Sequence, residues 1–238
     1  MGKKSINYHK KDDVAEPDNS DNENMAVTPF QIKDCALITQ TSNGLPAMNL
    51  REFRERVATV PLDSIFHHFC ETVLRPSFDD PEFHNDFAIW ARRALHDHVL
   101  AERLEILDPF EYPNLEEFRR IIIDILDDRL SEVAYIPWVT ENRTFHFLRA
   151  TTVVFDTGKT IDSPERLSRA IAEMTTSSIY YHFWEARRRT EEGLDDFSAW
   201  LKEWNSRGEK IIEALSQVDF YFLSLRELQN ILVKVTQS

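Results

Sequence analysis

Glycine is scarce in this sequence, with five in 238 residues. Turn-rich all-β folds need more glycine, so the composition favours a helical protein. Cysteine is scarcer still, since Cys35 and Cys70 are the two present. They fall at non-equivalent positions of a repeat described below, which argues against a disulfide framework. We therefore expect a reducing, cytoplasmic location.

Long apolar runs and an excess of positive charge are also missing. No run approaches the ~20 residues that a membrane span needs, and the N-terminal segment has no apolar signal region. Lys+Arg number 28 against 41 Asp+Glu, for a formal charge of −13. Because phosphate contacts need a basic surface, this excess of negative charge disfavours binding to nucleic acid. We expect neither a nucleic-acid nor a membrane partner.

The sequence does contain a repeated stretch. Residues 64–75 read SIFHHFCETVLR, and residues 178–189 read SIYYHFWEARRR. Half of the aligned positions are identical, namely Ser64/Ser178, Ile65/Ile179, His68/His182, Phe69/Phe183, Glu71/Glu185 and Arg75/Arg189. The register holds without a gap back to Gly44/Gly158, so the sequence predicts an internal duplication.

The duplication predicts the domain organisation. Residues 1–29 offer little apolar surface to bury, which indicates a disordered tail. Residues 30–134 form the first helical repeat and residues 135–238 the second. Hydrophobic residues make up 42% of the chain, which is ample for a buried core. We expect the repeats to pack into one body about a pseudo-two-fold axis.

Each repeat is expected to be mainly α-helical after a short extended segment. FQIKDCALITQT (30–41) and FHFLRATTVVFDT (145–157) are rich in β-branched and aromatic residues, and each is expected to close in a turn, at 43–44 and at 157–158. Apolar spacing of three and four predicts the helices that follow. Asp63 or Ser64 is the expected cap of the first repeated stretch, and Asp86 and Asp196 are the expected caps of the next helices. Gly208 is expected to end a helix in the left-handed conformation.

Two histidine–glutamate pairs are the sharpest candidate for chemistry. His68 with Glu71, and His182 with Glu185, lie three apart on predicted helices and share a face. Facing each other across the pseudo-two-fold, they would bring imidazoles and carboxylates together as a ligand or metal site.

Asp86 and Asp196 could complete such a shell. The structural alternative is that each histidine is buried and hydrogen-bonded to the aspartate that opens the next helix. Each glutamate would then pair with an arginine four residues on, Glu71 with Arg75 and Glu185 with Arg189.

An anion site is a second candidate, because guanidinium groups match phosphate and carboxylate geometry. Its residues would be Arg75, Arg187, Arg188 and Arg189, with surface ion pairs as the alternative. The pairs Arg92–Arg93 and His96/His98 fit ordinary helix-surface charges. No signature of a common catalytic class appears, so the sequence assigns no catalytic residue, no cofactor and no resident metal.

The doubled pattern S-I-Y/F-x-H-F, then N/D-D-F-x-x-W, then hydrophobic-D-P/F-aromatic before a capped helix, resembles the prokaryotic domain of unknown function DUF5752. The resemblance covers nearly everything from Phe30 onward. It departs from the family in the second half, which has the shorter loop before Asp196. It implies a place in sugar or glycosyl-transfer metabolism and no established activity.

Three functions follow as expectations. The first is a non-catalytic binding or regulatory module for a protein or small metabolite, linked to sugar metabolism. The second is a metal- or sugar-phosphate-dependent enzyme that uses the paired His-x-x-Glu motifs. The third is a purely structural, oligomerising protein.

Overall fold

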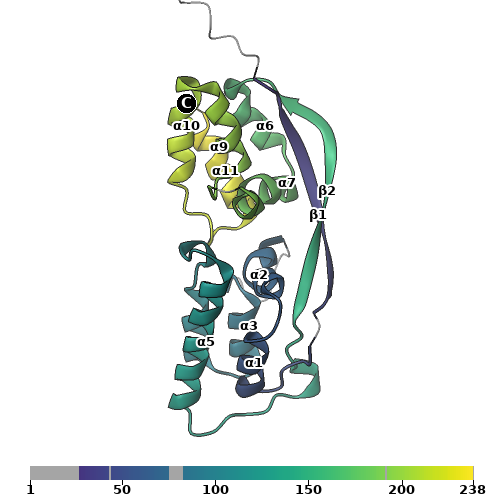
Figure 1. Cartoon of the computed structure of the whole chain (residues 1–238), viewed down its shortest axis with the longest axis vertical. Coiled ribbons are helices and arrows are strands. Elements are labelled where there is room, and N and C mark those ends of the chain that lie inside the picture. Colours follow the sequence, from purple (N-terminus) through teal and green to yellow (C-terminus); the bar gives the residue numbers. More distant parts are fainter. Residues whose placement is uncertain (1–26, 43, 75–82, 191, 238) are drawn as a thin grey trace, which may run out of the picture.

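A computed structural model describes residues 27–42, 44–74, 83–190 and 192–237. The fold is mainly helical with one small sheet, as the composition predicts. Two groups of helices are stacked along the longest axis, and a pair of strands runs down one side of both (Figure 1). The predicted tail lies outside the described residues as far as residue 26. Among the described helices, none combines the length and the apolarity needed to cross a bilayer.

The N-terminal helical group holds the helices that precede the second strand. They are α1 (Leu50–Val57), α2 (Leu62–Cys70), α3 (Asp86–Arg93), α4 (His98–Glu105) and α5 (Leu115–Glu132), with the 3-10 turns η1 (Glu71–Leu74), η2 (Pro109–Glu111) and η3 (Glu141–Arg143).

The C-terminal helical group holds the remaining helices. They are η4 (Pro164–Arg166), α6 (Leu167–Glu173), α7 (Thr176–Ile179), the π-helical η5 (Tyr180–Glu185), α8 (Ala186–Arg189), α9 (Asp196–Leu201), η6 (Lys202–Trp204), α10 (Ser206–Ser216) and α11 (Leu225–Val235).

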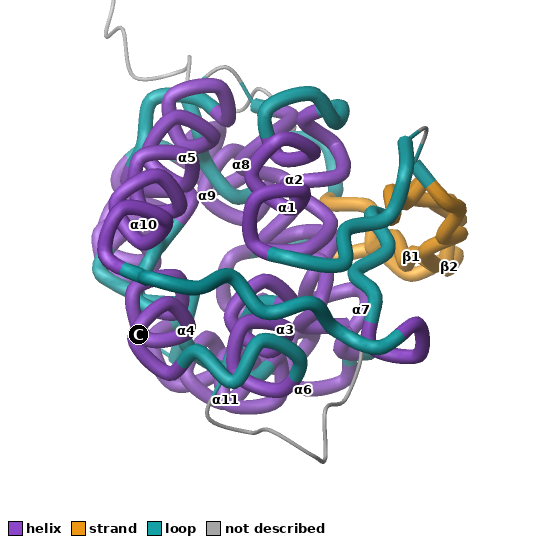
Figure 2. Tube along the Cα trace, turned by 90° about the horizontal axis from the view of Figure 1, so that it is seen from below, coloured by secondary structure: helices purple, strands orange, loops and turns teal. Residues whose placement is uncertain are grey.

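The two strands form an antiparallel ribbon. β1 (Phe30–Thr41) pairs with β2 (Leu148–Ile161), in a register that runs from Phe30↔Ile161 to Thr41↔Leu148. Seen along the long axis, the ribbon lies to one side of the helices (Figure 2). The segments predicted to be extended therefore pair with each other.

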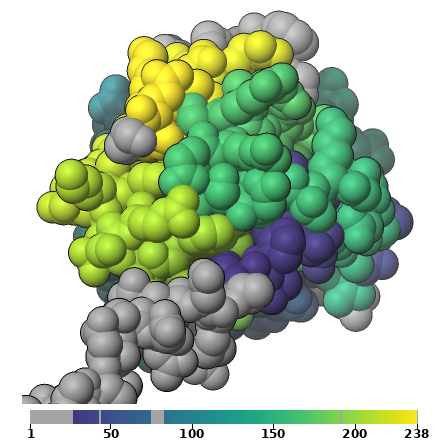
Figure 3. Space-filling model, turned by 90° about the horizontal axis from the view of Figure 1, so that it is seen from above, coloured from purple at the N-terminus to yellow at the C-terminus, as the bar shows by residue number. Residues whose placement is uncertain are grey.

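The start of β1 packs on the C-terminal helical group, not on the helices that follow it in sequence. The Phe30 ring lies 4.8 Å from the His182 ring and 5.7 Å from the Trp200 ring. Trp200 Nε1 donates to the Thr28 carbonyl at 3.0 Å. In Figure 3, β1 (purple) lies between green and yellow-green segments of the C-terminal half.

The chain that leads into β2 makes the matching contacts with the N-terminal helical group. The Phe145 ring lies 4.9 Å from the His68 ring and 5.6 Å from the Trp90 ring. Trp90 Nε1 donates to the Arg143 carbonyl at 2.8 Å. The C-terminal helical group thus packs against the start of β1, and the N-terminal helical group packs against the chain that leads into β2.

The two groups also touch directly. Phe110 of η2 packs against Phe220 with ring centroids 5.0 Å apart, and the Tyr221 hydroxyl donates to the Phe69 carbonyl at 3.1 Å. Buried side chains from both groups and from the ribbon form one hydrophobic cluster.

The predicted turn at 157–158 is wrong, because β2 continues to Ile161. Gly158 has φ +71°, and the register shifts between Ile32 and Lys33 of β1 opposite it. This is a β-bulge, in which glycine takes the left-handed conformation at low cost.

Three predicted helix ends are also wrong. Asp86 and Asp196 are the first helical residues, and the caps are Asn85 and Asp195, which accept from Ala88 N and Ser198 N. Neither Asp63 nor Ser64 caps α2, because the helix begins earlier, at Leu62 after Pro61.

The break predicted at Gly208 lies at Asn205 instead. Asn205 has φ +50°, whereas Gly208 lies inside α10. A Cβ at Gly208 would come within 2.3 Å of the Leu201 carbonyl oxygen. The glycine therefore permits close helix packing and does not end a helix.

Candidate functional site

The repeated Ser-x-x-x-His stretch makes hydrogen bonds to both the carbonyl and the N–H of one strand residue. On α2, Ser64 Oγ donates to the Leu148 carbonyl at 2.6 Å, and the Leu148 N–H donates to His68 Nε2 at 2.9 Å. His68 follows Ser64 by four positions, so both side chains lie on one face of the helix. We call this arrangement the strand clamp.

The C-terminal helical group has its own strand clamp, on β1. Ser178 Oγ donates to the Lys33 carbonyl at 2.6 Å, and the Lys33 N–H donates to His182 Nε2 at 2.8 Å. The two clamps therefore hold opposite strands of the ribbon.

An aspartate completes each clamp. His68 Nδ1 lies 2.7 Å from Asp86 Oδ2, and His182 Nδ1 lies 2.8 Å from Asp196 Oδ2. Because each Nε2 accepts a backbone N–H, the proton of the imidazole is on Nδ1 and is donated to the carboxylate. Both histidines are 2% exposed. The prediction that they are buried against these aspartates is confirmed.

The glutamates of the two motifs have different partners. Glu71 Oε2 lies 2.6 Å from His67 Nδ1, and both side chains are buried. Glu185 pairs with Arg189 as predicted, and burial raises the pKa of its carboxyl. Arg75, the predicted partner of Glu71, lies outside the described residues.

The strand clamps leave the histidines little capacity to bind a metal. Both ring nitrogens of His68 and His182 already make hydrogen bonds. Among the described residues, no group of three or more His, Cys, Asp or Glu could hold a metal ion. The ligand role of the six motif residues stays a hypothesis, and the geometry gives them a structural role.

Three of the four arginines predicted to bind an anion are engaged elsewhere, and the fourth, Arg75, lies outside the described residues. Arg189 contacts Glu185 and lies 2.9 Å from Asp196. Arg188 lies over the Phe66 ring, 3.9 Å from its centroid, and Arg187 is 3.7 Å from Asp195, with its pKa lowered by burial. Among its described residues, the predicted anion site is therefore not formed as a cluster of uncompensated cations.

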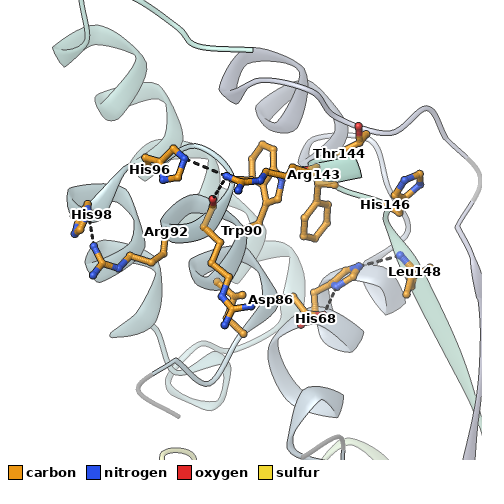
Figure 4. Close-up of a pocket in the computed structure, with 14 residues that line it drawn as sticks. His68, Asp86, Trp90, Arg92, His96, His98, Arg143, Thr144, His146 and Leu148 are labelled. Carbon is orange, nitrogen blue, oxygen red and sulfur yellow. Dashed lines mark hydrogen bonds and ion pairs between the residues drawn. The ribbon is translucent and has the colours of Figure 1, made fainter. Parts of the chain in front are cut away.

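Cationic side chains gather instead in a depression of about 810 Å³ beside the first strand clamp (Figure 4). We call it the Arg–His pocket. His68, Asp86, Trp90 and Phe145 form part of its lining, and Asp86 is the one carboxylate among the described lining residues. The other basic residues of its lining are Arg92, Arg93, Arg143, His96, His98 and His146.

Local structure explains how these groups meet. Arg92 and Arg93 occupy the last turn of α3, where basic residues suit the helix dipole. His96 follows in a tight turn with φ +55°, and His98 begins α4. Asp97, the acid between them, caps Leu100 N and pairs with Arg129 at 2.8 Å, so its charge is compensated by that arginine.

Two guanidinium groups of the pocket donate to imidazoles. Arg143 Nη1 lies 3.1 Å from His96 Nε2 and also donates to the Arg93 carbonyl at 3.0 Å. Arg92 Nη1 contacts His98 Nε2 (Figure 4). Within the part of the chain that the structure describes, neither Arg92 nor Arg143 makes an ion pair with a carboxylate.

The C-terminal helical group has no matching charge cluster at the equivalent positions. In the register that aligns Asp86 with Asp196, Arg92 corresponds to Lys202 and Arg93 to Glu203. Lys202 pairs with Glu192. The Arg–His pocket therefore belongs to one half, whereas the strand clamps belong to both.

Sequence reasoning missed this pocket. The stretch 92–98, RRALHDH, holds four basic or titratable side chains against one acid, which was the available signal. Arg143 and His146 come from the second predicted repeat, about 50 residues away, so periodicity does not reveal their proximity.

A second depression, of about 780 Å³, lies where the two helical groups meet. Arg187 and Arg188 line it together with Asp108, Glu111 and other carboxylates. Four carboxylates face two arginines in its lining, so it provides no comparable attraction for an anion.

Comparison with known proteins gives a family. The profile of a family of unknown function, DUF5752, matches residues 27–237. The chain is similar to the solved structure of OrfY from Thermoproteus tenax, with 27% identity and a TM-score of 0.74 over 89% of this chain and 95% of that one. No curated protein matches the chain. On the family match, which spans nearly the whole sequence, the chain belongs to the DUF5752 family.

Proposed function

We propose that this protein is a non-catalytic binding module whose Arg–His pocket takes up a small metabolite carrying a phosphate or similar oxyanion. The observation that supports the proposal is the charge of the lining: three arginines and several histidines against one aspartate, in a chain of formal charge −13. A local cationic surface in an acidic protein focuses anions on that spot.

The uncompensated guanidinium groups support the same proposal. Arg92 and Arg143 have no described carboxylate partner, and guanidinium groups recognise phosphate through paired N–H donors. The depression of about 810 Å³ falls within the ~300–1,000 Å³ typical of small-molecule sites. A sugar phosphate is the proposed ligand class, in line with the metabolism that the family resemblance implies.

The experiment is a calorimetric titration with glucose 6-phosphate, glucose and sulfate. We expect the two anions to bind and glucose to bind weakly or not at all. Arg143→Gln and Arg92→Gln should each weaken anion binding about tenfold or more, because a charge-assisted hydrogen bond contributes about 1.5–3 kcal/mol.

Lys202→Gln is the matched control, since Lys202 occupies the position equivalent to Arg92 and lies outside the pocket. It should bind the anions as the wild type does. Equal binding of glucose and glucose 6-phosphate, or no loss in the arginine variants, would contradict the proposal. Turnover of the sugar phosphate would favour the alternative, an enzyme that uses His68, Glu71, His182 and Glu185.

We also propose that the two helical groups descend from one duplicated unit and are related by a pseudo-two-fold axis. The support is the set of matching contacts: two strand clamps, two aspartate partners, and two tryptophans that donate to carbonyls ahead of the strands. The repeats would span 30–134 and 135–238. The proposal includes action in the cytoplasm, with a metabolite or protein partner, self-association as an option, and no nucleic-acid or membrane partner.

A further inference from the structure

The two arginine–imidazole contacts of the Arg–His pocket constrain its protonation state. A guanidinium group has N–H donors and no acceptor, and it stays protonated in proteins. In the contacts Arg143–His96 and Arg92–His98, the imidazole Nε2 must therefore accept. Each of these histidines is neutral in this arrangement, with its proton on Nδ1.

Protonation of either histidine would break its contact. An imidazolium has N–H donors on both nitrogens, so no lone pair remains to accept from the arginine, and two cations then face each other. An anion placed between them removes this conflict, because it accepts from the guanidinium and the imidazolium together. The protonated form thus fits a filled pocket, and the neutral form fits an empty one.

The charged groups around His96 are mainly cationic. Arg143 faces it from η3, and Arg92 and Arg93 line the same pocket from α3. The adjacent acid, Asp97, is paired with Arg129 of α5.

His98 has neighbours of both signs. Arg92 contacts it, and Glu102 and Glu105 line a smaller depression on its other side. Glu105 is paired with His84. The remaining titratable lining groups of the Arg–His pocket are His68, Asp86 and His146.

We propose that the Arg–His pocket takes up its oxyanion together with one or two protons, which His96 and His98 accept as their arginine contacts open. This rests on the proposed anion site and adds a regulation to it. Because binding takes up protons, a fall of pH strengthens it. By linkage, the affinity rises at most about tenfold per pH unit for each proton taken up.

The test uses sulfate, which keeps its charge of −2 between pH 5.5 and 8 and so adds no titration of its own. Sulfate affinity is measured by calorimetry across this range, and at pH 6.5 in two buffers of different ionisation enthalpy. We expect affinity to rise severalfold as the pH falls from 7.5 to 6.5. The difference in heat between the buffers should report proton uptake between 0.3 and 2 per sulfate, by the same linkage.

The variant His96→Asn/His98→Gln assigns the protons. Asparagine tolerates the left-handed backbone at position 96, and both amides can accept from arginine without titrating. The variant should show a flat pH profile and no proton uptake. His84→Gln, which changes a histidine that does not line the pocket, should keep the wild-type pH profile.

The outcomes separate this inference from the proposed function. Sulfate binding without proton uptake, or proton uptake that persists in His96→Asn/His98→Gln, would overturn the inference and leave the anion site standing. Absence of sulfate binding at both pH 5.5 and pH 8 would overturn both, because a proton-linked site must bind at the lower pH.

Discussion

At the scale of residues, the repeated histidines serve the backbone of the ribbon. A two-stranded sheet leaves the outer N–H and C=O groups of both strands unpaired. The clamps on α2 and on α7–η5 satisfy such groups at Leu148 and Lys33. The Nδ1 of each histidine donates in turn to a partly buried aspartate. A buried polar chain of this kind stabilises the fold only when every member is satisfied.

His68→Ala and His182→Ala should therefore each destabilise the protein. Each removes an acceptor from a strand N–H and a donor from an aspartate, and an unsatisfied buried group costs about 1–3 kcal/mol. Urea unfolding followed by circular dichroism measures the loss. His146→Ala, at an exposed histidine, is the control and should leave the midpoint unchanged. Wild-type stability in both clamp variants would show that the hydrogen bonds are dispensable.

Half of this arrangement was predictable from the sequence. The order of His68 and Asp86 recurs in His182 and Asp196, although 18 positions separate the first pair and 14 the second. A buried imidazole on an apolar face needs a partner. The other half was not, because Leu148 is 80 residues from His68 and Lys33 is 149 from His182. No local pattern encodes which strand residue enters a clamp. The Arg–His pocket was missed for the same reason.

At the scale of elements, the strands show where local signals mislead. A glycine after an apolar run suggests a turn, and Gly44 and Gly158 gave the same signal in the two halves. At Gly158 the hydroxyl of Thr157 instead bonds the Ile32 carbonyl across the ribbon, and β2 continues to Ile161. Pairing with β1, which sequence periodicity does not report, decides between a turn and a bulge.

Gly208→Ala tests the corrected role of that glycine. At a helix position where the added Cβ meets no other atom, replacing glycine with alanine stabilises the folded protein by roughly 0.5–1 kcal/mol, since alanine restricts the unfolded chain. Here the added Cβ would meet the Leu201 carbonyl oxygen, which is backbone and cannot turn aside. We expect a loss of about 1–3 kcal/mol in urea unfolding, as for overpacking. A gain in stability would show that α10 does not pack on α9 as described.

At the scale of the whole molecule, the ribbon joins the helical groups by exchange. Thr28 and Phe30 contact the C-terminal helical group, while Phe145 and Phe147 fill the core of the N-terminal one. The sequence predicted two repeats and their order. It could not predict this exchange. A strand segment can make the same kind of contact with the helices of its own repeat or with those of the other repeat.

The exchange makes a prediction about fragments of equal length. Fragment 28–134 keeps β1 but lacks Phe145 and Phe147, which pack on Phe53 and Phe87 with ring centroids 5.0–6.1 Å apart. Fragment 44–150 drops β1 and keeps both rings and the clamped Leu148. Losing a buried phenylalanine costs about 3–5 kcal/mol. Fragment 44–150 should therefore show the stronger near-ultraviolet circular dichroism and the more cooperative unfolding. If 28–134 folds better instead, each half builds its core from its own leading strand, and the exchange seen here does not determine what folds.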